Sequence, residues 1–107
     1  MNSSRIRIDP LALQGAAGQA VAALKLLANQ DRLMLLCQLS NGEMCVSELE
    51  AQLEIRQPTL SQQLGVLRNE GVVATRREGK NIYYRVADPA LLQILALLYR
   101  LYCPKET

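Results

Sequence analysis

The chain has 107 residues, of which 50% are hydrophobic and 21% charged, and a net charge of +2. This length predicts one globular domain with a modest core. Charged residues interrupt the apolar stretches before they reach the roughly 20 residues that cross a bilayer, and the N-terminus lacks the apolar segment of a signal peptide. We therefore expect a cytoplasmic protein without a membrane partner.

Residue usage also bears on the class of protein. The chain contains three Cys but no His, Phe or Trp. Without His, and with no Gly-rich phosphate loop or paired-carboxylate cleft visible, the sequence does not predict an enzyme. Three Cys in a cytoplasmic chain argue against a structural disulfide framework.

The N-terminal region predicts an arm followed by a helix. Residues 1–9 are expected to form a flexible arm, and residues 10–107 one domain. Pro10 can open a helix that continues over residues 11–28. One face of this helix carries only small residues, including Gly15, Gly18 and Ala22. Small side chains favour close packing against another helix.

Two shorter helices are expected next. Asp31 is predicted to cap a helix that runs to about Leu39, where Asn41 and Gly42 follow. Ser47 is predicted to cap a third helix, with Glu50 as its capping-box partner, that ends near Leu53.

A fourth helix is expected to begin at Pro58, which suits the first turn of a helix. Leu60, Leu64 and Leu67 recur at helical spacing and predict one buried stripe. Gly71 is expected to end the helix.

The period then changes to that of strands. Residues 72–77 and 81–86 are rich in β-branched and aromatic side chains, and Gly79 lies between them, which predicts a β-hairpin. Asp88 and Pro89 begin a final helix that continues to about Cys103. This helix is apolar on nearly every side, which predicts cover from a second subunit together with the first helix. We therefore expect a homodimer.

The predicted fold is mainly α with a β-hairpin wing, in the order α-α-α-α-β-β-α of a winged helix-turn-helix. From Arg56 to Arg85 the chain has six basic and two acidic residues, which suits a surface that faces phosphates. The fourth helix would enter the major groove of double-stranded DNA, and the hairpin would contact its backbone. The predicted DNA-binding residues are Arg56, Gln57, Thr59, Ser61, Gln62, Gln63, Arg68, Arg76, Arg77 and Lys80. Two subunits would read a palindromic operator.

Three segments carry a family resemblance: LKLLANQDRLMLLCQL, SELEAQLEIRQPTLSQQLGVLRNEGVV and RREGKNIYYRV. They resemble the ArsR/SmtB family of bacterial repressors, and QPTLSQQLGVLR is similar to its thiol-sensing branch, typified by BigR, SqrR and HlyU. The resemblance implies a dimeric, cofactor-free repressor that leaves its operator when an inducer modifies it. The terminal-helix zinc site of other branches needs His, so we expect no metal site of that kind.

The cysteines carry the expected switch. In the thiol-sensing branch one cysteine lies on the second helix and one near the end of the last, and Cys37 and Cys103 match those positions. The resemblance therefore implies that Cys37 and Cys103 sense oxidants or reactive sulfur species, whereas it gives Cys45 no role. An inert buried thiol remains an alternative interpretation of Cys37.

Other functions remain open at this point. The repressor could respond to arsenite through Cys45 and another cysteine, or it could be a constitutive winged-helix regulator without an inducer. A winged helix that binds proteins rather than DNA is a further alternative.

Overall fold

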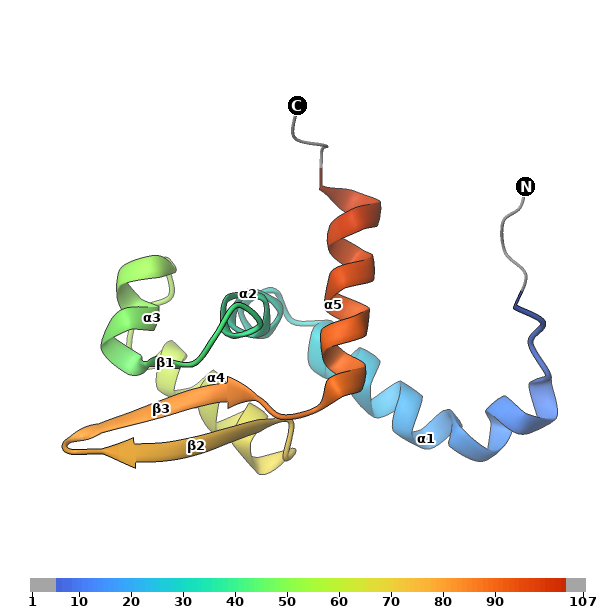
Figure 1. Ribbon diagram of the computed structural model, residues 1–107, viewed down its shortest axis with the longest axis horizontal. Helices are drawn as coiled ribbons and strands as arrows, with labels where there is room; N and C mark the ends of the chain where they lie inside the picture. Colours follow the sequence, from blue (N-terminus) through green and yellow to red (C-terminus); the bar gives the residue numbers. More distant parts are fainter. Residues whose placement is uncertain (1–5, 104–107) are drawn as a thin grey trace.

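The structure is a computed structural model that describes residues 6–103. Its elements are α1 (Pro10–Leu27), α2 (Gln30–Leu39), β1 (Met44–Cys45), α3 (Val46–Gln52), α4 (Thr59–Asn69), β2 (Val73–Glu78), β3 (Asn81–Val86) and α5 (Pro89–Tyr102) (Figure 1). The predicted helices and hairpin are confirmed in their predicted order. Residues 1–5 of the predicted arm and 104–107 of the predicted domain lie outside the described residues; residues 6–9 are exposed and form no helix or strand.

The core is built mainly from leucine, with valine and isoleucine. Leu35 and Leu36 of α2 are fully buried, and α3 and α5 contribute Leu49 and Leu91. The predicted stripe on α4 is confirmed, because Leu60, Leu64 and Leu67 are all within 2% of complete burial. Since this stripe fixes the rotation of α4, the opposite face of the helix is turned to solvent.

The sheet has three antiparallel strands in the order β1-β3-β2. The hairpin pairs Val73 with Val86 and Glu78 with Asn81, which leaves Gly79 and Lys80 as a two-residue turn. Gly79 has a φ of 64°, a conformation that only glycine adopts without strain.

Strand β1 was not predicted. It has only two residues, too few for an alternating pattern, and forms because Met44 and Cys45 pair with Tyr84 and Tyr83 of β3.

Two predicted helix caps are wrong. Asn29, rather than Asp31, caps α2: its Oδ1 accepts a hydrogen bond from the Arg32 N–H at 3.0 Å. Helix α3 begins at Val46, with Cys45 at the cap position, and the Glu48 carboxylate accepts from the Cys45 N–H at 3.0 Å. Strand β1 pairs with β3 up to Cys45, and α3 begins at the next residue, Val46. The helix therefore begins before Ser47.

The fourth helix also starts later than predicted. Pro58 precedes α4 as its cap residue, and Thr59 is the first helical residue. Gly71 does follow the end of α4, with a φ of 76°, so that part of the prediction is confirmed.

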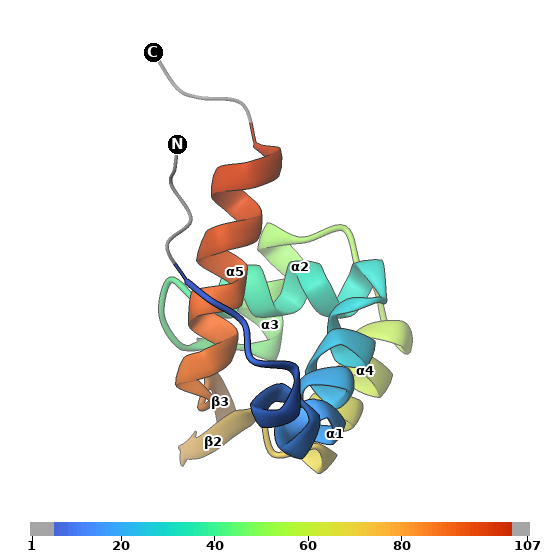
Figure 2. The same ribbon diagram turned by 90° about the vertical axis from the view of Figure 1, so that its right-hand side faces the viewer.

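Helices α1 and α5 extend away from the body formed by α2, α3, α4 and the sheet (Figures 1 and 2). Leu26 is the only buried residue of the 18-residue α1. On α5, Leu91 and Leu95 face the core, whereas Leu97, Leu101 and Tyr102 are 45%, 63% and 80% exposed. One subunit therefore leaves a broad apolar surface on these two helices uncovered.

Within the described residues no single helix has the length and apolar composition to cross a membrane. Helices α1 and α2 meet those criteria only as a pair, and they are bent by 96° where they join.

Candidate nucleic-acid interface

The outward face of α4 is polar. Ser61 and Gln62 are exposed and Thr59 is half-buried, and all three lie outside the leucine stripe. Short hydroxyls and amides at the N-terminal end of a helix suit contacts to phosphates and base edges in the major groove. The structure thus brings Thr59, Ser61 and Gln62 together on an accessible surface.

Gln57 holds the start of α4 in place. Its side-chain Oε1 accepts hydrogen bonds from the Ser61 backbone N–H at 3.2 Å and from the Ser61 hydroxyl at 2.6 Å. Pro58 has no side-chain acceptor, so Gln57 satisfies one of the helix donors that would otherwise lack a partner. The amide oxygen of Gln57 is therefore engaged, and its NH₂ group remains as a donor.

Gln63 is turned away from the polar face. It is half-buried, and its Oε1 accepts a hydrogen bond from the Arg32 guanidinium at 3.1 Å. Of the predicted DNA-binding residues on α4, Gln63 is thus the one whose amide is directed toward α2.

Four predicted basic contacts are exposed and available. Arg56 precedes α4, Arg68 lies in its last turn, and Arg77 and Lys80 lie on the hairpin. Within residues 6–103 the only ion pairs are those of Arg76, so these four cations carry uncompensated charge. Such charges can bind phosphate oxygens.

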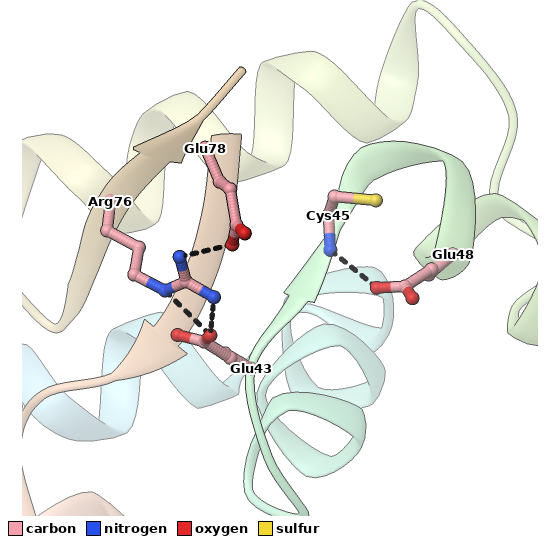
Figure 3. Close-up of polar contacts among 5 residues, drawn as sticks. All are labelled: Glu43, Cys45, Glu48, Arg76 and Glu78. Carbon is pink, nitrogen blue, oxygen red and sulfur yellow. Dashed lines mark hydrogen bonds and ion pairs between the residues drawn. The ribbon is translucent and has the colours of Figure 1, made fainter. Parts of the chain in front are cut away.

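Arg76 has different surroundings from its neighbours (Figure 3). Its guanidinium forms ion pairs with Glu43, just before β1, and with Glu78 at 2.7 Å, and its Cζ lies 4.7 Å from the centre of the Tyr83 ring. These hydrogen bonds raise the pKa of Arg76 and lower that of Glu43. Arg76 thus crosses β3 and joins the wing to the segment that leads into α3.

Sequence reasoning missed Glu43 and Arg32. Glu43 lies 33 residues from Arg76, and Arg32 lies 31 residues from Gln63. No local spacing reveals such pairs, although the presence of an arginine within the apolar run of α2 is a weak signal that its side chain has polar partners.

Cys37 and Cys103 lie on α2 and at the end of α5. Cys37 is half-buried, and Cys103 is exposed directly after α5. Burial raises the pKa of Cys37, and the negative charge of a Cys103 thiolate raises it further. Cys37 lines a groove of about 730 Å³ between α2 and α5, beside Tyr99 and Arg100.

Cys45 lies in a separate setting. It is buried at the junction of β1 and α3, and its Sγ lies 3.3 Å from the Ser47 hydroxyl. In the part of the chain that the structure describes, no three His, Cys, Asp or Glu side chains gather as metal ligands would.

Comparisons with known proteins agree with this geometry. The model of the bacterial regulatory protein arsR family matches residues 29–75, which include α2, α3 and α4. The biofilm growth-associated repressor of Agrobacterium fabrum is 52% identical over 95 residues, covering 89% of this chain and 81% of the relative.

Solved structures agree as well. The transcriptional repressor BigR from Xylella fastidiosa superposes with a TM-score of 0.88 at 44% identity, covering 92% of this chain and all of that one. Reduced HlyU from Vibrio cholerae N16961 has a TM-score of 0.80 at 39% identity, over 87% of this chain and 98% of the other. The relatives of this chain are DNA-binding transcriptional regulators and not enzymes. This chain belongs to the arsR family of bacterial regulatory proteins.

Proposed function

We propose that the protein is a homodimeric, cytoplasmic transcriptional repressor that leaves its operator when Cys37 and Cys103 are oxidised or bridged by reactive sulfur species. The observation that carries the DNA-binding part is the polar face of α4 beside four exposed cations that form no ion pair within residues 6–103. The repressor in A. fabrum and the repressor BigR support the direction of regulation.

The surface of α1 and α5 supports the dimer. Ala90, Ile94, Leu97 and Leu101 are spaced by four, three and four residues, so they form one stripe along α5. At its base this stripe adjoins the small residues Ala16, Ala20 and Ala23 of α1 around a common groove. A second copy can cover both surfaces by the same contacts, since dimers are usually two-fold symmetric.

Such a dimer presents two copies of α4. Recognition helices about one helical turn apart, roughly 34 Å, would read the two halves of a palindromic operator. We propose that Thr59, Ser61 and Gln62 contact base edges or phosphates, with Arg56, Arg68, Arg77 and Lys80 on the backbone, while Gln57 fixes the start of the helix.

The setting of Cys37 and Cys103 supports the switch. A persulfide can pass its outer sulfur to Cys103 and leave as a thiol; the Cys37 thiol then attacks the inner sulfur, forming a disulfide and releasing hydrogen sulfide. Hydrogen peroxide can instead accept the two electrons: the Cys103 thiolate attacks one oxygen and releases water, giving a sulfenic acid, and the Cys37 thiol then displaces a second water to form the disulfide. A direct disulfide needs Cα atoms about 4.4–6.8 Å apart, and a polysulfide bridge would span a longer distance. Either bridge ties α2, which packs on α4, to the end of α5.

The test is a gel-shift titration on a duplex that the wild-type protein selects from a random library. We expect treatment with a persulfide or peroxide to release the wild type and Cys45→Ser, whereas Cys37→Ser and Cys103→Ser stay bound. A coupling of 1–3 kcal/mol corresponds to release by about 5–150-fold. Mass spectrometry of the same samples identifies the modified cysteines.

Each alternative has its own outcome. Release by arsenite that only Cys45→Ser abolishes would establish the metalloid sensor instead. A triple Cys→Ser variant that behaves as the wild type under every treatment would establish a constitutive regulator. Duplex binding that ignores salt would exclude phosphate contacts and favour a protein-binding winged helix.

A further inference from the structure

The guanidinium of Arg32, a residue of α2, contacts both α1 and α4. Arg32 lies in the first turn of α2. Its Nε donates to the Leu26 carbonyl at 2.9 Å and one terminal NH₂ donates to the Lys25 carbonyl at 3.1 Å, both at the end of α1. The other NH₂ donates to Gln63 Oε1 on α4 at 3.1 Å.

The contacts with α1 satisfy its C-terminal end. The last carbonyls of a helix lack partners within the helix, and a positive charge near them is favourable because of the helix dipole. Arg32 supplies both the donors and the charge for Lys25 and Leu26. Its own backbone is fixed in turn, since its N–H donates to Asn29.

The contact with Gln63 reaches the recognition helix. Gln63 lies between the buried Leu60 and Leu64 on one side and the exposed Gln62 on the other, and it is half-buried. A planar guanidinium has its N–H groups in a fixed fork, so engaging three acceptors holds them in one relative arrangement. A lysine ammonium lacks this fork.

We propose that Arg32 and Gln63 are positioning residues for DNA binding, which hold α4 at a fixed place relative to the end of α1, and that Gln63 does not itself read DNA. The inference rests on the proposed function, in which α4 enters the groove and α1 joins the subunits. Helix α2 packs on both α1 and α4. The hydrogen bonds of Arg32 therefore couple the position of α1, in the proposed dimer interface, to that of α4.

Two substitutions of Gln63 separate positioning from reading. Gln63→Glu keeps an acceptor oxygen for Arg32, whereas Gln63→Met keeps the size and removes the acceptor. We expect Gln63→Glu to bind the selected duplex within about twofold of the wild type, and Gln63→Met to bind about tenfold more weakly, because it loses a hydrogen bond to a charged donor. Fluorescence anisotropy on the reduced dimer measures both.

The opposite order overturns the proposal. If Gln63 faces DNA, a carboxylate there is repelled by phosphate and cannot donate to adenine, so Gln63→Glu would bind more weakly than Gln63→Met. Wild-type affinity in Gln63→Met would also overturn it. If the wild type itself is monomeric or binds no duplex, the proposed function fails instead.

Arg32→Lys provides a second test, because it keeps the positive charge but removes the planar guanidinium with its fixed N–H groups. We expect it to weaken binding about as much as Gln63→Met, and the double variant to be no weaker than either, because both changes remove one interaction. The salt slope of binding should stay at the wild-type value, since neither side chain contacts phosphate. Additive losses or a smaller slope would contradict the assignment.

Discussion

At the residue scale, the partners of a side chain decide whether it is free to bind DNA. Arg76 and Arg77 are adjacent, equally basic and both exposed, and the sequence alone predicts both as DNA contacts. In the structure the guanidinium of Arg76 lies between two carboxylates and over the Tyr83 ring, whereas Arg77 has no acidic partner among residues 6–103. The two arginines should therefore contribute differently to binding.

The salt dependence of DNA affinity measures this difference. Arg77→Ala should reduce the slope of log affinity against log salt by about 0.9 for each phosphate that the protein no longer neutralises. Arg76→Ala should leave the slope nearly unchanged, because the charge it removes is already balanced by Glu43 and Glu78. Equal reductions in the two variants, measured by anisotropy at a series of salt concentrations, would show that Arg76 leaves its acidic partners for DNA.

Cys37 and Cys103, the proposed sensing pair, should also differ in reactivity. The thiolate is the reactive form, and burial beside Cys103 raises the pKa of Cys37. At neutral pH we expect iodoacetamide to alkylate the exposed Cys103 before Cys37. The Cys37 rate should still be increasing above pH 9, since its raised pKa delays ionisation. Peptide mass spectrometry over time gives both rates, and faster alkylation of Cys37 at pH 7 would contradict the assignment.

At the element scale, interactions between residues distant in sequence fix the wing and α4. The wing joins the body through β1–β3 pairing and through Arg76, while α4 is held by its leucine stripe. The Arg76 contact and the leucine stripe can be tested separately, because the first is exposed and polar and the second is buried and apolar.

The wing contact should depend on pH. The Arg76 hydrogen bond lowers the pKa of Glu43 below its unfolded value, so its stabilisation is present above the ordinary glutamate pKa and is lost as the pH falls through the folded value. We expect the wild type to melt above Glu43→Gln at pH 7, with the difference shrinking toward pH 3. A difference in Tm that does not change with pH would exclude this linkage.

The leucine stripe should contribute much more to stability. Leu64 is 2% exposed, and Leu64→Ala should lower the free energy of unfolding by about 2–5 kcal/mol, because it removes buried methyl groups and leaves a cavity. Urea denaturation measures the loss. A change below about 0.5 kcal/mol would show that the stripe does not hold α4.

At the scale of the whole molecule, α1 and α5 extend away from the rest of the chain (Figure 1) and carry apolar side chains that one subunit leaves exposed. Burial of a leucine side chain contributes about 1.5–3 kcal/mol, and a symmetric interface counts it twice. Burial of these helices against a second copy would therefore stabilise the proposed dimer.

Leu97→Asp tests whether a second copy buries the stripe of α5. Leu97 is 45% exposed on the stripe of α5, and we expect the variant to weaken dimerisation at least about 100-fold by sedimentation equilibrium, from a loss of about 3–6 kcal/mol. Val66→Asp is the matched control, because Val66 is 36% exposed on α4, outside α1 and α5. A Leu97→Asp variant that remains dimeric would exclude this surface as the interface.

The sequence by itself determined the helices, the hairpin and the stripe of α4, because hydrophobic period, Gly79 and Pro89 act locally. Through resemblance it also predicts Cys37 and Cys103 as the sensing pair. Only the tertiary structure decided the caps at Asn29 and Cys45, the strand β1, and which polar side chains are already engaged. Strand β1 depends on its pairing with β3, and the engaged side chains depend on pairs 31 or 33 residues apart, Arg32 with Gln63 and Glu43 with Arg76; no local pattern specifies which of these groups meet when the chain folds.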